Sequence, residues 1–156
     1  MNFFSLLLLK KTVAAALASI SFSVVFGIKK KHLFHATTIA AVAYFVYYTV
    51  LFFNGTLFLA AFLSTALAAL FSEILARVCR APAIVFLLPA VIPTVPGGTI
   101  YYAMRDLLSN NPQGSLDNLL ITLKVALGIA GGIVSVSIIF TIVFNKIKNI
   151  KSKKTQ

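Results

Sequence analysis

Two ionisable side chains lie four residues apart inside an otherwise apolar stretch of the chain. Glu73 and Arg77 would share one face of a helix, close enough to neutralise each other. Ionisable residues inside membrane spans are costly and often mark ion or substrate paths, so the pair could serve coupling or gating. The alternative is a structural ion pair at the membrane interface, with the arginine reaching toward the surface. We favour the structural ion pair.

The remaining polar side chains give weaker signals. His32 and His35 have the spacing of one helix face, but two histidines without a third ligand do not define a metal site, so we expect no metal. Arg105 and Asp106 are neighbours whose pairing at the membrane interface explains them adequately. No expected span carries a Ser/His, Cys/His or paired-carboxylate constellation. We therefore expect no catalytic residue, no cofactor and no enzymatic activity.

The most informative stretch is residues 82–108, which is long enough to span a membrane but is interrupted by four prolines and a Gly97-Gly98 pair. Proline frees backbone carbonyls from the helix, and hydrocarbon tolerates such groups only when protein or a watery cavity covers them. Each half holds about ten residues and would be roughly 15 Å long, so the break falls near the membrane midplane. Secondary transporters bind solute at discontinuous helices of this kind. A kink packed against a neighbouring helix is the alternative.

The second half-helix would begin at the glycine pair, with its first amides directed toward the midplane. The positive end of a helix favours an anion, such as the carboxylate of a small solute, and glycine lets that solute approach the backbone. Nearby hydroxyl groups could add hydrogen bonds. The candidates for the substrate path are Pro93, Thr94, Pro96, Gly97, Gly98, Thr99 and Tyr101.

The composition predicts that these elements lie in a membrane. Apolar residues make up 60% of the 156 residues, the mean hydropathy is +0.98, and 11% are charged. A soluble domain of this length cannot bury so much apolar surface, so we predict an all-α polytopic transmembrane helix bundle in the lipid bilayer. The net charge of +11 lies in short clusters beside apolar runs rather than on one basic face, which argues against nucleic-acid binding.

About five spans fit the apolar runs, and the fourth is the broken one. We expect them at residues 12–28, 33–53, 56–78, 82–108 and 116–144, within a single transmembrane domain of residues 1–145. Residues 146–156 would form a basic tail, disordered at a lipid surface. A cleaved signal peptide is the alternative for the first run, and a re-entrant loop is the alternative for the fourth. Asn54-Gly55 would form the turn between the second and third spans.

With five spans, ten of the 14 basic residues lie on one side of the membrane and four on the other. The positive-inside rule then places the amino terminus outside and the carboxyl terminus in the cytoplasm of a multi-pass protein of the bacterial inner membrane. A re-entrant fourth segment would move the tail lysines outside, so we prefer five spans.

Small residues recur along the last span. Gly128 and Gly132 form a small-xxx-small pair, which lets another helix approach closely. We expect this face to pack against a partner helix.

Residues 71–77, 82–86 and 92–101 resemble the small, YjjB-like half of the threonine/serine exporter family, and the resemblance covers nearly the whole chain. The positions that match the family motif are Glu73, Arg77, Pro93, Pro96, Gly97 and Tyr101. Thr94 stands where the family often has a bulky apolar residue, which leaves the substrate open.

The resemblance implies a subunit of a bacterial exporter of threonine and serine or of a dicarboxylate such as succinate. It also implies a second membrane subunit, the other half, as partner, and it allows an oligomer. The alternative is a small membrane scaffold or a holin-like pore protein without specific transport. The broken segment argues against that alternative, because a simple pore gains little from a costly defect.

Overall fold

The computed structural model describes residues 2–153, with side chains for residues 6–143, and all its regular elements there are helical. The elements are α1 (Asn2–Val25), α2 (Lys30–Phe52), α3 (Leu57–Val78), α4 (Ile84–Val91), the short 3-10 helix η1 (Ile92–Thr94), α5 (Gly97–Leu108) and α6 (Pro112–Lys153). The predicted all-α class is confirmed.

Four of the helices, α1, α2, α3 and α6, are long and apolar enough to cross a membrane. The segment of α4 and η1 joins α5 at a bend of 47°, and the two parts together also reach the length of a span. The prediction of about five candidate spans, with the fourth broken, is therefore confirmed.

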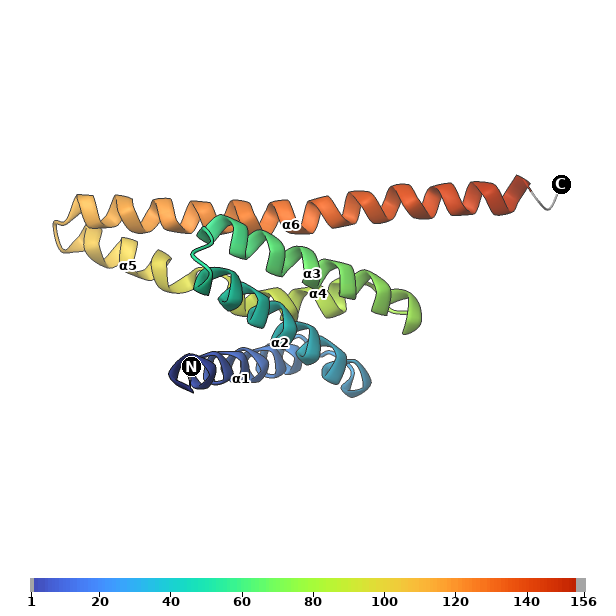
Figure 1. Ribbon diagram of the computed structural model, residues 1–156, viewed down its shortest axis with the longest axis horizontal. Helices are drawn as coiled ribbons and strands as arrows, with labels where there is room; N and C mark the ends of the chain where they lie inside the picture. The colour runs from blue at the N-terminus through green and yellow to red at the C-terminus, as the bar shows by residue number, and fades with distance from the viewer. Residues whose placement is uncertain (1, 154–156) are drawn as a thin grey trace.

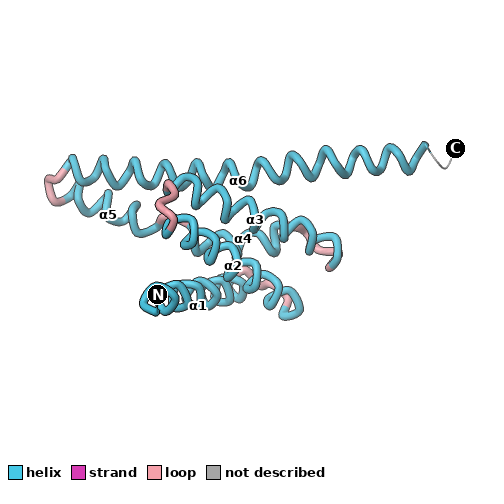
Figure 2. The backbone as a smooth tube through the Cα atoms, in the orientation of Figure 1, coloured by secondary structure: helices cyan, strands magenta, loops and turns pink. Residues whose placement is uncertain are grey.

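The first half of the broken segment lies inside the bundle and the second half leaves it (Figure 1). Helix α4 packs between α2 and α3, and η1 touches α1 and α2. The core there combines the fully buried ring of Phe86 with small side chains such as Ala40 and Ala68. Helix α5 instead packs mainly along α6, forming a hairpin that extends past the turn between α2 and α3 (Figure 2).

Four helices end in the same local structure, in which the second residue after the helix adopts a left-handed backbone. These residues are Gly27, Asn54, Arg80 and Asn110, with φ of 65°, 56°, 50° and 55°. In each case the next amide bonds a carbonyl five residues back, as from Ile28 to Ser23 at 3.0 Å, which satisfies a carbonyl at the helix end. The expected turn at Asn54-Gly55 is one of these.

The two glycines of the predicted packing face meet α3 of the same chain. A Cβ added at Gly128 would lie 2.6 Å from the carbonyl oxygen of Phe58, and one added at Gly132 would lie 2.5 Å from that of Phe62. The expected packing of a helix against Gly128 and Gly132 is confirmed, and that helix is α3 of the same chain rather than one from a second subunit. From Gly128 to Gly132 on α6, the contacted residue on α3 advances from Phe58 to Phe62. The two helices, α3 and α6, therefore run parallel. The chain must then travel back along the bundle through α4 and α5, which disfavours a re-entrant loop.

Helix α6 is longer than the last predicted span. Its 42 residues extend for roughly 63 Å, about twice the thickness of the hydrocarbon core. It begins at Pro112, a residue well suited to the first turn, and the helix continues to Lys153. The expected disorder of the tail is therefore wrong for residues 146–153, while residues 154–156 lie outside the described residues.

Candidate functional site

The break is a compact turn whose backbone groups are partly satisfied within it. The carbonyl of Ile92, which would have bonded the amide that Pro96 lacks, accepts the amide of Val95 at 3.1 Å. The amide of Gly97 donates to the carbonyl of Val95 at 2.8 Å. The start of α5 has no side-chain cap. The next amides of α5, beginning with that of Gly98, are thus polar backbone groups that the break leaves for a ligand or neighbour.

A cavity of about 270 Å³ lies beside the break, where α1 and α2 meet η1. Its lining consists of Lys11, Ala14, Ala15, Ala18, Tyr44 and Pro93. The three alanines follow Lys11 by three, four and seven residues, so they share its helix face, and their small side chains leave the space open. The Nζ atom of Lys11 also lies 5.8 Å from the centre of the Tyr48 ring.

This lining suits a small solute that bears a carboxylate. An ammonium group can bind a carboxylate by a charge-assisted hydrogen bond, and a tyrosine hydroxyl can donate a second one. No acidic side chain lines this cavity to compete for Lys11. Lys11 directly precedes the first expected span, residues 12–28, and was not predicted as a site residue. The signal that could have revealed it is the run of alanines on its face.

The hydroxyl groups of the two candidate threonines are engaged elsewhere. Thr94 is buried, and its hydroxyl donates to the carbonyl of Val91 at 2.6 Å. The hydroxyl of Thr99 lies 2.6 Å from that of Thr122 on α6 and donates to the carbonyl of Pro96 at 2.9 Å. Both side chains therefore stabilise the break and its contact with α6.

The other candidates face outward. A Cβ added at Gly97 or Gly98 would meet nothing within 4 Å. Tyr101 is 64% exposed and packs against Tyr102, with 5.5 Å between ring centres. The structure thus gathers Pro93 with Lys11 at the cavity, whereas the glycine pair is open and does not line it.

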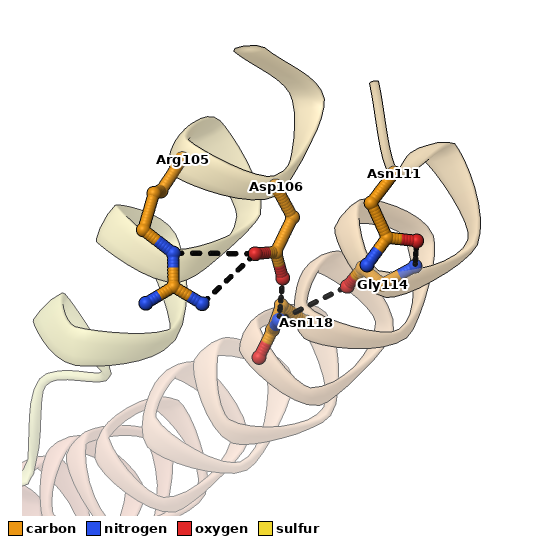
Figure 3. Close-up of polar contacts among 5 residues, drawn as sticks. All are labelled: Arg105, Asp106, Asn111, Gly114 and Asn118. Carbon is orange, nitrogen blue, oxygen red and sulfur yellow. Dashed lines mark hydrogen bonds and ion pairs between the residues drawn. The ribbon is translucent and has the colours of Figure 1, made fainter. Parts of the chain in front are cut away.

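A polar cluster joins the far ends of α5 and α6 (Figure 3). The carboxylate of Asp106, which is largely buried, accepts hydrogen bonds from Arg105 at 3.0 and 3.3 Å and from Asn118 at 3.0 Å. Asn118 also donates to the carbonyl of Gly114 at 3.0 Å. Asp106 and Arg105 therefore pair with each other, as expected for a local ion pair. Together with the Thr99–Thr122 contact, the cluster holds α5 against α6.

The predicted pair on α3 forms. Arg77 Nη1 lies 2.7 Å from Glu73 Oε2, and the guanidinium carbon lies 4.6 Å from the centre of the Phe140 ring. The pair therefore joins α3 to α6 near the end of α3. This contact with α6 is what a structural ion pair would make.

The two histidines lie against an aromatic ring. His32 and His35 meet Phe86 nearly edge-on, with ring centres 5.3 and 6.4 Å apart. Within residues 2–153, no three His, Cys, Asp or Glu side chains come together in a way that could hold a metal ion.

Comparison with known proteins identifies one family. The family model described as "Threonine/Serine exporter, ThrE" matches residues 11–153. No curated protein and no solved structure matches the chain significantly.

Proposed function

The chain belongs to the threonine/serine exporter family, and we propose that it is one subunit of a bacterial small-solute exporter that works with a second membrane half. Its solute would be threonine or serine, or a dicarboxylate such as succinate. All of these carry a carboxylate. The protein would cross the inner membrane five times, with its amino terminus outside and its carboxyl terminus in the cytoplasm.

The cavity at the break is the observation on which the proposal chiefly rests. It combines a cation, Lys11, with a hydroxyl donor, Tyr44, and with Pro93 of the interrupted span. Transporters place solute where a helix is discontinuous, because the freed backbone groups and helix ends can bind it there. We infer that Lys11 binds the carboxylate, while the start of α5 lines the path.

The uncovered side of α5 supports a second subunit. Helix α5 turns its buried residues, Ala103 and Asp106, toward α6. Its other side is apolar and open: Met104 is 64% exposed, Leu107 62% and Leu108 85%. Either lipid or protein can cover apolar side chains. At the start of the same helix, however, the exposed Gly98 leaves a backbone amide that lipid cannot satisfy, so we infer that the other half lies here.

The distribution of basic residues supports the proposed orientation. The loop between α1 and α2 and the loop between α3 and α4 border one common pocket, so they lie at the same end of the bundle. Lys29, Lys31 and Arg80 are in that pocket. By the positive-inside rule, this end would face the cytoplasm.

The test compares two neighbouring lysines on α1. Lys11→Gln removes the ammonium group from the cavity, and Lys10→Gln is the matched control, because Lys10 does not line the cavity. Each variant is produced with the other half in cells, and efflux of threonine, serine and succinate is measured at equal membrane abundance. A lost charge-assisted hydrogen bond should slow efflux by about tenfold or more in Lys11→Gln, and Lys10→Gln should stay within about twofold of the parent. Equal efflux from both variants would remove Lys11 from the solute path.

A further inference from the structure

A second pocket lies at the end of the bundle where α1, α2 and α3 begin or end, away from the break. It has a volume of about 330 Å³, and it lies between the loop that follows α1 and the loop that follows α3. Three cationic side chains line it, those of Lys29, Lys31 and Arg80. Apolar side chains, including Phe26 and Val85, form other parts of the wall. The pocket therefore offers positive charge beside apolar surface.

No carboxylate balances this charge within the described part of the chain. The sequence holds three acidic residues. Glu73 pairs with Arg77 and Asp106 pairs with Arg105, while Asp117 lies in the second turn of α6, whose first turns pack against α5 outside this pocket. The three cations are thus available to an anion from outside the chain.

Arg80 occupies a backbone position that would favour glycine. Helices α1 and α3 both end beside the pocket in a left-handed residue, Gly27 in one and Arg80 in the other. The two remaining left-handed residues are asparagines, which tolerate this conformation better than arginine does. Strained residues of this kind gather at binding sites, where the side chain serves a purpose that the fold alone does not require.

His32 supplies a polar group without a protein partner. His32 is among the residues that line the pocket, it is only 6% exposed, and its Nδ1 atom forms no hydrogen bond with the rest of the described chain. Buried polar groups are usually paired, so this nitrogen is one more polar atom beside the three cations that a bound ligand or water would satisfy. The start of α2 adds free backbone amides, since Lys29 provides no side-chain cap.

We propose that this pocket binds a phosphate group, specifically that of an anionic phospholipid headgroup. The candidate spans α1 and α3 end beside the pocket and α2 begins there, so it lies at the depth where headgroups reside. Basic pockets between membrane helices bind such headgroups, and the apolar wall suits the adjoining glycerol and acyl chains. A bound headgroup would join the loop after α1 to the loop that leads into α4, and so would steady the start of the broken span.

The experiment titrates the purified full chain with phosphatidylglycerol, phosphatidylcholine or inorganic phosphate and counts bound molecules by native mass spectrometry. The wild-type chain should retain phosphatidylglycerol and should not retain phosphatidylcholine, whose headgroup has no net charge. Equal retention of both lipids would overturn the proposal. Binding of inorganic phosphate without phosphatidylglycerol would also overturn it, because the ligand would then be a free ion.

Arg80→Gly makes the test independent of misfolding. Glycine accepts the left-handed backbone without strain, so this variant should unfold at the same temperature as the parent or higher. Its affinity for phosphatidylglycerol should nevertheless fall about tenfold or more, because the guanidinium is lost. A second variant, Lys29→Gln with Lys31→Gln, should weaken binding similarly, whereas the control Lys10→Gln with Lys124→Gln, with the same net charge, should not. If Arg80→Gly binds phosphatidylglycerol as tightly as the parent, the pocket is not a headgroup site.

Discussion

The contact between α3 and α6 makes a sharp prediction about two neighbouring glycines. A Cβ at Gly132 would lie 2.5 Å from the carbonyl oxygen of Phe62 and 2.9 Å from the amide of Ala66, and backbone atoms cannot move aside alone. A Cβ at Gly131 would lie 3.3 Å from the ring of Phe62, a side chain that can yield. We therefore expect Gly132→Ala to push the two helices apart and Gly131→Ala to be tolerated.

The expected change in unfolding free energy is the balance between a gain in helix propensity and the cost of overpacking. Replacing glycine by alanine inside a helix gains about 1 kcal/mol of helix propensity at either position. Forcing extra volume into a packed contact costs about 1–3 kcal/mol, and the backbone partners at Gly132 place its cost at the upper end. Gly132→Ala should thus lose about 1–2 kcal/mol of unfolding free energy, which lowers the melting temperature by about 2–8 °C in a chain of this size. Gly131→Ala should be neutral or more stable by up to about 1 kcal/mol.

Thermal unfolding of the purified chain in detergent, without any partner, measures both variants. The chain can be measured alone, because the helix that covers these glycines, α3, belongs to the same chain. If Gly132→Ala melts at the same temperature as Gly131→Ala, α3 does not lie against Gly132, and the parallel arrangement of α3 and α6 fails with it.

The other predictions concern transport and topology. Gly97→Leu and Gly98→Leu should each insert normally, because a Cβ at either position meets nothing within 4 Å in this chain. Both should abolish efflux, because the added side chain would block an approaching solute, and parental efflux from both would make the break a packing kink. The chain expressed alone should show no efflux above background, whereas co-expression with the other half should restore it, and full efflux from the single chain would refute the two-subunit proposal. Reporter fusions after Gln156 should be active on the cytoplasmic side and fusions within residues 110–115 on the outer side; a carboxyl-terminal reporter active only outside would defeat the five-span topology.

Local chemistry made the spans and the break predictable. The apolar runs, the turn at Asn54-Gly55 and the prolines around Pro93 act over a few residues, so the sequence identifies them without knowledge of the packing. The pair of Glu73 and Arg77 was predictable for the same reason, because four residues along a helix always bring two side chains together. Its contact with Phe140 was not, because that depends on how α6 is placed.

The features that the sequence did not predict depend on contacts between elements that are distant along the chain. The small residues of α6 predict that another helix packs closely against it, but their spacing does not indicate whether that helix is α3 or belongs to another subunit. In the sequence, Lys11 is one of the lysines that border a span, and only the fold shows that Pro93 of η1 lines the same cavity. The helical course of residues 146–153 was missed because a lysine-rich composition suggests a solvated tail, whereas a long helix already formed by the preceding span can continue into it.

The route of the broken segment explains why this chain would need another half. Helix α4 belongs to the core formed with α2 and α3, while α5 departs with α6, so the break lies at the boundary between bundle and hairpin. There the amides that follow that of Gly97 at the start of α5 have no acceptors within the helix, and Gly98, which carries the first of them, is exposed. Lipid cannot satisfy those amides, because hydrocarbon offers no acceptors. In a membrane this edge must therefore be closed by protein, water or solute, and a second half that closes it would convert the cavity at Lys11 into an enclosed path.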